Sequence, residues 1–416
     1  MSGTTTPARN IRIPLFAFFS ANLISFVGDR LTLLAIPWFV LQTTGSVTKT
    51  GITAFFTTLP NIISAFLSGP LVDKLGYRRT SVVGDIASGI STVLIPLLYH
   101  TVGLAFWQLL ILVFLGGLLK APSATARISM LPDLGKAAQM RLEQVNAIGD
   151  GSMRVSGFLG APLAAVLIVL IGASNLLWLD AASFFVSALL IGLIVPPTPV
   201  ASRGAEETPA SAGTMLDGLR FILGNRLLFS LILVSTITNL LDTALSSVAM
   251  PVYAKQIWGS VLPIGLLSAT FGGCAFLGIL LFAAFGHRLP RRMTFALCYI
   301  AIGIRFWALA FMLPLPILFA VYAFNGLAVG PVNPIGSTVE QEITPVEMRA
   351  RVFGASMAGS LAATPLGGLL GGYLINWLGL LSALFVMGTG YLFATGSLLV
   401  NPTLKDMQNS SNHTED

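Results

Sequence analysis

The amino-acid sequence predicts an all-α membrane protein in which twelve transmembrane helices form two pseudo-symmetric six-helix bundles. The first observation is composition: 55% of the 416 residues are hydrophobic and only 10% are charged, whereas a soluble domain carries about 25% charged residues. The second is spacing, because apolar runs of roughly 20 residues, enough to cross a bilayer, recur between polar or Gly/Pro-rich breaks. The third is an internal repeat.

The apolar runs define the expected spans in chain order. The first bundle is predicted from 14–40, 47–70, 80–99, 103–125, 143–171 and 175–195, and the second from 226–257, 262–285, 293–313, 315–337, 353–378 and 381–401. The Pro-, Ser- and Thr-rich stretch between them indicates a linker, with a short amphipathic helix from Met215 to Arg226. The predicted organisation is therefore a bundle over 1–195, a linker over 196–225, a bundle over 226–402 and a tail over 403–416.

The distribution of basic residues predicts the orientation in the membrane. Most of the 23 Lys and Arg residues fall on one side of the predicted spans, and the loops on the other side hold only Lys49 and Lys255. Because cytoplasmic loops carry an excess of Lys and Arg, both termini are expected in the cytoplasm of a multi-pass protein of a bacterial-type cytoplasmic membrane. The basic residues are dispersed over short loops. The net charge of +6 therefore indicates a lipid bilayer as surroundings and no nucleic-acid partner.

The internal repeat relates the two predicted bundles. The segment PWFVLQTTGSV begins at Pro37, and PVYAKQIWGSV begins at Pro251, with Pro, an aromatic residue, Gln and Gly-Ser-Val in register at an offset of 214. The pair Arg78-Arg79 recurs as Arg291-Arg292 at an offset of 213. Parallel halves are a transporter architecture in which substrate binds near the bilayer midplane, between the halves, as access alternates.

The segment GPLVDKLGYRR at 69–79 resembles the loop between helices two and three of the major facilitator superfamily. That loop follows Gly-x-Leu-x-Asp-Arg/Lys-x-Gly-x-Arg/Lys-Arg/Lys, and only Tyr77 stands where many members have another basic residue. The resemblance covers nearly the whole chain. The segment GDRLTLLAIPWFVLQTTGS of the first span, with Leu131-Pro132-Asp133, resembles the branch of drug, macrolide and enterobactin exporters. It implies a twelve-helix major facilitator fold, alternating access, proton antiport and a monomer.

The resemblance also implies a conformational latch at this loop. Gly69 and Gly76 permit close helix approach and a tight turn. Asp73 is expected to accept from the free N–H groups at the start of the eleventh helix, or to pair with Arg349 or Arg351. In the alternative interpretation, Arg78 and Arg79 only set the topology.

Four ionisable residues within spans are the candidates for proton coupling. They are Asp29, Arg30, Arg154 and Asp242. A charged residue at the bilayer centre costs about 2.5–3.5 kcal/mol on the milder insertion scales, so a functional role is the default hypothesis. Asp29 is the first candidate, because a carboxylate that leaves water holds a proton more firmly. The alternative is a permanent bridge from Asp29 to Arg154 or another cation.

Asp242 lies one residue before the position that the repeat makes equivalent to Asp29. It is a candidate for proton coupling or substrate binding. Arg305 is expected to make a structural pair or to reach the interface. Lys120, Asp85 and Asp180 are expected near span ends, at the membrane interface.

A lipophilic substrate requires an aromatic-lined cavity with few polar contacts. The cavity candidates lie on helices that line the cavity in the fold implied by the resemblance. They are Asn22, Phe26, Trp38, Gln42, Phe55, Asn61, Asn239 and Asn325. The alternative for the aromatic residues is contact with lipid or packing in the core.

Other motifs narrow the function. Gly157, Gly160 and Pro162 resemble the antiporter glycine motif of the superfamily, although Ala replaces several of its glycines. No Gly-x-x-x-x-Gly-Lys-Ser/Thr loop occurs, so the expected energy source is a proton gradient rather than ATP. No cofactor, metal site or enzymatic activity is expected.

The prediction is therefore a secondary transporter that exports amphipathic or lipophilic small molecules, of drug, macrolide or siderophore type, by proton antiport. Two alternatives stay open. One is a proton-linked importer of a nutrient or lysolipid, because the same buried charges serve either direction. The other is a lipid scramblase or a non-transporting membrane sensor.

Overall fold

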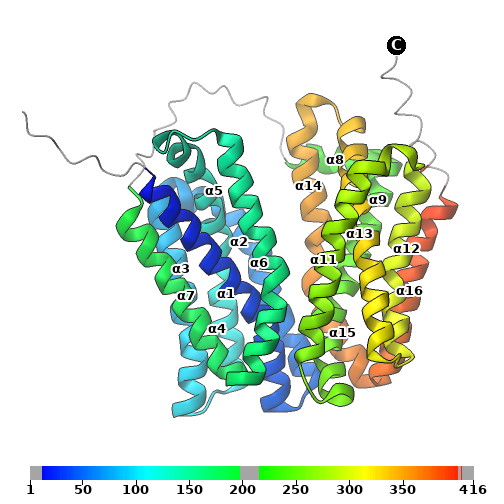
Figure 1. The fold of residues 1–416 in the computed structure, drawn as a ribbon, viewed down its shortest axis with the longest axis horizontal. Helices are drawn as coiled ribbons and strands as arrows, with labels where there is room; N and C mark the ends of the chain where they lie inside the picture. The colour runs from blue at the N-terminus through cyan, green and yellow to red at the C-terminus, as the bar shows by residue number, and fades with distance from the viewer. Residues whose placement is uncertain (1–11, 197–214, 402–403, 405–416) are drawn as a thin grey trace, which may run out of the picture. The chain divides into compact units, whose positions relative to one another are not determined.

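The computed structural model describes residues 12–196, 215–401 and 404, and within these ranges the ordered elements are all helices. This confirms the predicted all-α fold (Figure 1). The predicted tail over 403–416 and most of the predicted linker lie outside the described residues.

By their contacts, the helices group into two compact units. Unit 1 comprises Met1–Ala35 and Phe56–Glu207, and unit 2 comprises Ile36–Phe55 and Thr208–Asp416. The grouping assigns 36–55, the end of the first helix and the start of the second, to unit 2. The predicted domain boundaries at 195 and 226 stay predictions.

The first half of the chain forms long helices joined by short turns. They are α1 (Ile13–Thr44), α2 (Val47–Leu75), α3 (Tyr77–Thr101), α4 (Phe106–Leu118), α5 (Lys120–Ala137), α6 (Leu142–Ile171) and α7 (Ala173–Ile194). In unit 1, α3 packs along α7 and against α5, and α6 packs on both α5 and α7.

The second half repeats the pattern with more interruptions. Its helices are α8 (Met215–Gly224), α9 (Arg226–Ala244), α10 (Met250–Tyr253), α11 (Leu262–Phe285), α12 (Arg291–Ala310), α13 (Leu315–Ile343), α14 (Arg349–Ala362), α15 (Thr364–Leu378) and α16 (Leu380–Val400). Two π-helical turns, η1 (Leu245–Ala249) and η2 (Ala254–Trp258), flank α10, and two short 3-10 turns are η3 (Gly286–Arg288) and η4 (Val346–Met348). The helix expected from Met215 to Arg226 is present as α8.

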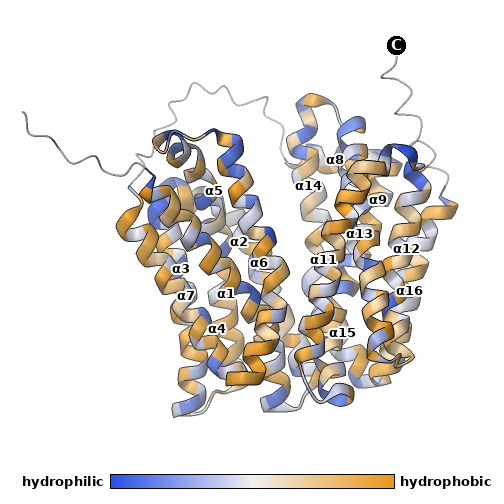
Figure 2. Ribbon diagram, in the orientation of Figure 1, coloured by the Kyte–Doolittle hydropathy of each residue, from blue (hydrophilic) through white to orange (hydrophobic). Residues whose placement is uncertain are grey.

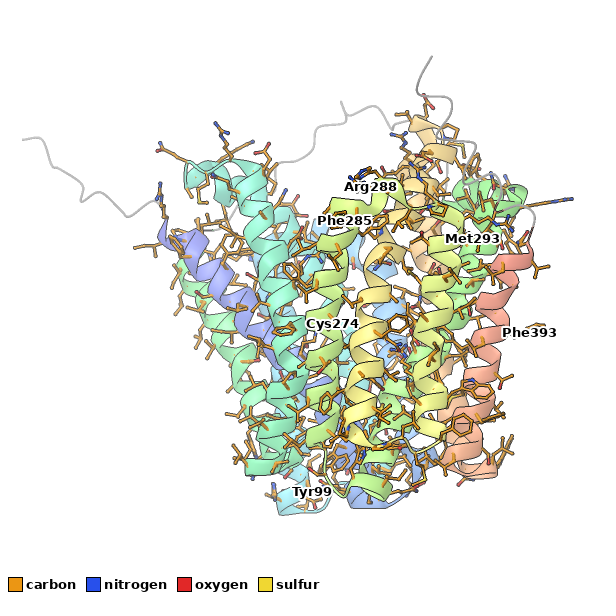
Figure 3. The ribbon with its side chains drawn as sticks, turned by 45° about the vertical axis from the view of Figure 1, so that its right-hand side comes forward. Tyr99, Cys274, Phe285, Arg288, Met293 and Phe393 are labelled. Carbon is orange, nitrogen blue, oxygen red and sulfur yellow. The ribbon has the colours of Figure 1, made fainter. Side chains whose placement is uncertain are left out.

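Eleven helical stretches in the described part of the chain are long and apolar enough to cross a membrane. The remaining predicted span, the second in chain order, corresponds to α2, which has 29 residues. Figure 2 shows hydrophobic residues along the helices of both units and hydrophilic residues gathered toward many helix ends. Large apolar side chains also point outward, such as Phe393 on α16, which is 84% exposed (Figure 3). Such an exterior suits lipid.

The fourth span differs most from its prediction. It was expected to end at 125, but it continues through α5 to Ala137, with a break at Leu119 between α4 and α5. Pro122 lies in the first turn of α5, where a missing backbone N–H costs little. Lys120 and Arg127 suggested a span end, whereas both lie inside unit 1 and are paired there with carboxylates.

Equivalent contacts reveal the internal repeat within each unit. Arg78, at the start of α3, donates to the carbonyl of Gly192 on α7, and Arg292, at the start of α12, donates to the carbonyl of Leu399 on α16 at 2.7 Å. The contacts therefore equate Arg78 with Arg292, at the offset of 214 shared by Pro37 and Pro251.

Residues 36–55 are attached to the rest of unit 2 by close contacts. Lys255 Nζ donates to the carbonyl of Leu41 at 2.6 Å, and these residues are repeat equivalents, 214 apart. Gly51 of α2 lies directly against Gly368 and Gly372 of α15, where a Cβ on Gly51 would come within 2.8 Å of the α15 backbone. Glycine is required here for close helix approach.

Candidate functional site

The first candidate residue, Asp29 of α1, forms an ion pair with Lys120 at the start of α5. The distance from Lys120 Nζ to Asp29 Oδ1 is 2.5 Å, and the two side chains are 33% and 32% exposed. The ammonium also lies 5.5 Å from the centre of the Phe184 ring on α7. Asp29 is therefore held between α1 and α5 but retains access to its surroundings.

Arg127, two helical turns after Lys120 on α5, forms a second and fully buried ion pair with Asp85 of α3. Three further hydrogen bonds hold it: Nε donates to Ser81 at 3.0 Å, Nη1 to Asn22 at 2.8 Å and Nη2 to Ser187 at 2.8 Å. A buried charge is stable only when it is paired and hydrogen-bonded. Arg127 fulfils both conditions and joins α1, α3, α5 and α7.

A third carboxylate, Asp180 of α7, is completely buried. The hydroxyl of Thr32 on α1 donates to its Oδ2, and the hydroxyl of Ser183 lies 3.4 Å from its Oδ1. Gly28 makes this approach possible, because a Cβ there would come within 2.4 Å of Asp180 Oδ1. The charged neighbours of Asp180 are Asp29 and Lys120. We refer to Asp29, Asp85, Lys120, Arg127 and Asp180 as the charge cluster.

A cavity of about 50 Å³ opens beside the charge cluster within unit 1. Its lining residues come from α1, α3, α5 and α7, and they are Ser25, Phe26, Asp29, Gly84, Asp85, Ser88, Lys120, Ser123, Ala124, Arg127 and Phe184. Drug-sized ligands occupy about 300–1,000 Å³, so the cavity is too small for one. It has room and polar partners for a few water molecules.

Unit 2 contains a simpler arrangement. Arg305 of α12 forms an ion pair with Asp242 of α9, and the side chains are 11% and 36% exposed. The guanidinium lies 5.7 Å from the ring centres of both Phe271 and Phe306. The structural pair expected for Arg305 is therefore present. We refer to Asp242 and Arg305 as the unit 2 pair.

The other two coupling candidates lie apart from these contacts. Arg30 packs its aliphatic stem against Gly160 of α6, where a Cβ would come within 2.3 Å of Arg30 Cβ. Arg154 is exposed. The predicted bridge from Asp29 to Arg154 is replaced by the bridge to Lys120, because Lys120 lies inside unit 1 and not at the interface. The structure therefore supports the alternative in which Asp29 pairs with a cation other than Arg154.

The predicted cavity residues separate into two groups. Asn22 and Phe26 lie at the charge cluster, where Asn22 accepts from Arg127 and Phe26 lines the cavity. In unit 2, Asn239 donates to the carbonyl of Ser360 at 3.0 Å, and Asn325 donates to the carbonyl of Ala301 at 3.0 Å. These two amides join helices within the unit.

The remaining cavity candidates do not gather around this cavity. Trp38 is buried, and its Nε1 has no hydrogen-bond partner within the described ranges. Gln42 and Asn61 are exposed, and Phe55 is half-buried. Their predicted role in a substrate cavity stays a prediction.

The latch residues occupy the turn between α2 and α3 and the start of α14. Gly76 has a φ of 78°, which a residue with a side chain rarely adopts; Asp73 and Arg79 are exposed. Arg349 donates from Nη2 to the carbonyl of Gln341 at 3.2 Å. Gly69 lies in α2, and Arg351 lies in α14, where its backbone packs on Gly218 of α8. The latch joins residues of the two units and stays a prediction.

Four members of the charge cluster were missed as site residues. Lys120, Asp85 and Asp180 were expected at the interface, and Arg127 was expected in a cytoplasmic loop; all four lie inside unit 1. The sequence contained a signal for three of them. Asp180 is flanked by the apolar runs LLWL and AASFF, and Lys120 and Arg127 are seven residues apart, on one face of a helix. Within the described residues, no group of His, Cys, Asp and Glu side chains is arranged to hold a metal ion.

Comparison with known proteins identifies the class of the chain. The sequence model of the Major Facilitator Superfamily matches residues 18–242 and 232–414. The chain therefore belongs to the Major Facilitator Superfamily, a class of membrane transporters rather than enzymes.

Two of the relatives align along nearly the full chain, and a third aligns along less than half of it. The Multidrug efflux pump Tap of Mycolicibacterium fortuitum is 29% identical over 404 residues, covering 96% of this chain and 98% of the relative. The pump of the same name from Mycobacterium tuberculosis (strain ATCC 25618 / H37Rv) is 29% identical over 400 residues, covering 95% of each chain. The Staphyloferrin A transporter of Staphylococcus aureus is 24% identical over 174 residues, covering 42% of this chain and 43% of the relative.

Solved structures share the fold at low sequence identity. The nucleoside transporter NupG superposes with a TM-score of 0.71 at 14% identity, covering 95% of this chain and 98% of that chain. A bacterial homologue of the human lysosomal transporter Spinster gives a TM-score of 0.70 at 16% identity, covering 98% of both chains. These similarities establish the fold, and the predicted major facilitator architecture is confirmed.

Proposed function

We propose that the protein exports amphipathic or lipophilic small molecules across the cytoplasmic membrane and that proton entry drives the export. Membership of the superfamily makes it a transporter, and relatives that align over its full length are named multidrug efflux pumps. The direction of transport and the class of substrate follow these relatives. The proton coupling follows from the charges inside unit 1.

The observation that carries the proposal is the unequal charge of the cluster. Among the described residues, it joins three carboxylates, of Asp29, Asp85 and Asp180, to the two cations Lys120 and Arg127. Fully ionised, the cluster has one excess negative charge inside the membrane span. An uncompensated buried charge is strongly unfavourable, and the binding of one proton removes it.

The cavity supplies the route for that proton. Asp29 and Lys120 both line it and are about one-third exposed, so Asp29 is the member that can exchange a proton with water. The cavity is too small for the expected substrate. We therefore assign it to water and protons rather than to the substrate.

The unit 2 pair is assigned a different role. One carboxylate and one guanidinium have no net charge, so Asp242 is stable in its ionised form. Asp242 is the more exposed partner. We assign it to substrate contact or to positioning of α9, whereas Asp29 carries the coupling. Arg30 and Arg154 are assigned no direct proton transfer.

Transport into inverted membrane vesicles energised by respiration tests the proposal. Ethidium and a macrolide are the probes, because both are amphipathic. Uptake that collapses with a protonophore is the expected result. Asp29→Asn should abolish uptake, whereas Asp133→Asn, at an exposed carboxylate on α5, serves as the matched control.

Other outcomes identify the alternatives. Accumulation in right-side-out vesicles alone identifies an importer. Movement of labelled phospholipid between leaflets without accumulation of any probe identifies a scramblase. Wild-type uptake that is insensitive to the protonophore contradicts proton coupling.

A further inference from the structure

We propose that Asp180 holds the proton of the charge cluster and exchanges it with Asp29, with Lys120 as the counter-ion that the two carboxylates share. The inference rests on the proposed proton coupling and extends it to a residue on α7. It follows from which carboxylate of the charge cluster is paired with which cation.

The ion pair of Arg127 and Asp85 is closed, in the sense that it is buried and each charge is already paired. Both side chains are buried, and four of the five N–H donors of Arg127 are taken by Asp85, Asn22, Ser81 and Ser187. The charge of Arg127 is therefore already balanced by Asp85 in a buried, hydrogen-bonded contact. Asp29 and Asp180 remain, with Lys120 as the one cation near both of them in the described chain.

Lys120 contacts Asp29 in this structure. Among the described residues, the hydrogen-bond partners of the Asp180 carboxylate are then the hydroxyls of Thr32 and Ser183, and none of its surface is exposed. A carboxylate in such a position is stable only when protonated, since hydroxyl donors alone do not balance a full buried charge. A protonated Asp180 can donate to the oxygen of Thr32, because a hydroxyl both donates and accepts.

The groups around Asp180 define the exchange. The charged residues that face it are Asp29 from α1 and Lys120 from α5, while Asp85 of α3 is occupied by Arg127. Helix α6 also packs on α7, but its charged residues Asp150 and Arg154 are exposed and do not face Asp180. When Lys120 moves from Asp29 to Asp180, the proton leaves Asp180 and binds Asp29. The total charge of Asp29, Asp180 and Lys120 is the same before and after the transfer.

The cavity gives this exchange a direction. Asp29 and Lys120 line the cavity, whereas Asp180 does not. A proton therefore enters from water at Asp29, passes to Asp180 as Lys120 returns to Asp29, and leaves by the reverse transfer. Asp180 acts as the protected store and Asp29 as the exchange point.

Infrared spectroscopy of the purified full-length protein tests where the proton resides. A protonated carboxyl group has a carbonyl stretch that is distinct from that of a carboxylate and shifts in D₂O. Wild type and the control Asp133→Asn should show this band, and Asp180→Asn should lack it. A band that persists in Asp180→Asn, or is absent from wild type, overturns the proposal.

A second variant covers the case in which Asp180→Asn does not fold. Thr32→Val removes the hydroxyl at Asp180 with little change of shape, so the carbonyl band should change frequency. An unchanged band overturns the placement of the proton on Asp180.

Transport separates this inference from the proposed function. In proteoliposomes, Asp180→Asn should lose ethidium accumulation driven by a pH gradient but keep ethidium exchange at equal pH. Full gradient-driven accumulation in Asp180→Asn overturns the exchange with Asp29. If wild type itself ignores the pH gradient, the proposed function fails, while the infrared band still decides the state of Asp180.

Discussion

The two units place buried charge in the same kind of helical bundle but connect it differently. In unit 1 the first span reaches the fourth, and five charged residues form one cluster beside a small cavity. In unit 2 the seventh span reaches the ninth, and one carboxylate pairs with one guanidinium between aromatic rings. The repeat preserves the backbone fold and the Arg78 and Arg292 contacts, whereas the charges have diverged. The charge cluster of unit 1 has more carboxylates than cations, whereas the unit 2 pair is balanced.

The largest expected effect comes from breaking the closed pair in unit 1. Arg127→Met leaves Asp85 buried without a cation, which should cost about 3–5 kcal/mol of stability. Thermal unfolding of the purified protein measures the loss. The double variant Arg127→Met/Asp85→Asn should recover much of it, because no unpaired charge remains. A single variant as stable as wild type would contradict the closed pair.

The corresponding change in unit 2 should cost less. Arg305→Met removes the partner of Asp242, but Asp242 is 36% exposed and can be partly solvated. We expect a loss of about 1.5–3 kcal/mol, the range for hydrogen bonds to charged groups. The same unfolding measurement compares the two units. A larger loss of stability in Arg305→Met than in Arg127→Met would contradict the expected difference between the two units.

The approach of α1 to Asp180 depends on Gly28. Gly28→Ala introduces a Cβ that would lie within 2.4 Å of Asp180 Oδ1. Overpacking of this kind costs about 1–3 kcal/mol, and it should also weaken gradient-driven transport because it displaces Asp180. Gly157→Ala is the control, since no atom lies within 4 Å of the added Cβ. Equal unfolding temperatures for the two variants would argue against a tight contact at Gly28.

The smallest effect is expected at the contacts that the repeat preserves. Arg78→Gln and Arg292→Gln each remove one donor to a backbone carbonyl, at Gly192 and Leu399. Each should cost about 0.5–1.5 kcal/mol, and the two losses should be similar if the contacts are equivalent. Arg79→Gln, at an exposed residue, should be neutral. Unequal losses at Arg78 and Arg292 would show that the equivalence is only geometric.

The sequence predicted the spans and the repeat well, because apolar length and basic loops follow directly from the physics of the bilayer. It predicted the cluster poorly. Lys120 and Asp29 are 91 residues apart, and their contact depends on how α1 and α5 are rotated in the bundle. Neither periodicity nor composition defines that rotation. The charge of Lys120 and Arg127 instead suggested the end of a span, which placed two central residues in the wrong environment.

Asp180 shows the same limit from the other direction. It was expected near a span end, but the approach of Gly28 and Thr32, from a helix about 150 residues earlier in the chain, makes it buried and hydrogen-bonded. Asp242 and Arg305 were each singled out from the sequence. Their pairing, too, became visible only in the folded unit.

The central claim is that unit 1, and not unit 2, couples transport to protons. Gradient-driven ethidium accumulation and equal-pH ethidium exchange in proteoliposomes, measured for Asp29→Asn and Asp242→Asn side by side, test it most directly. We predict that Asp29→Asn keeps exchange but loses accumulation, whereas Asp242→Asn still accumulates ethidium in response to the gradient, with a higher half-saturating concentration. Accumulation that survives in Asp29→Asn and disappears in Asp242→Asn would contradict the account.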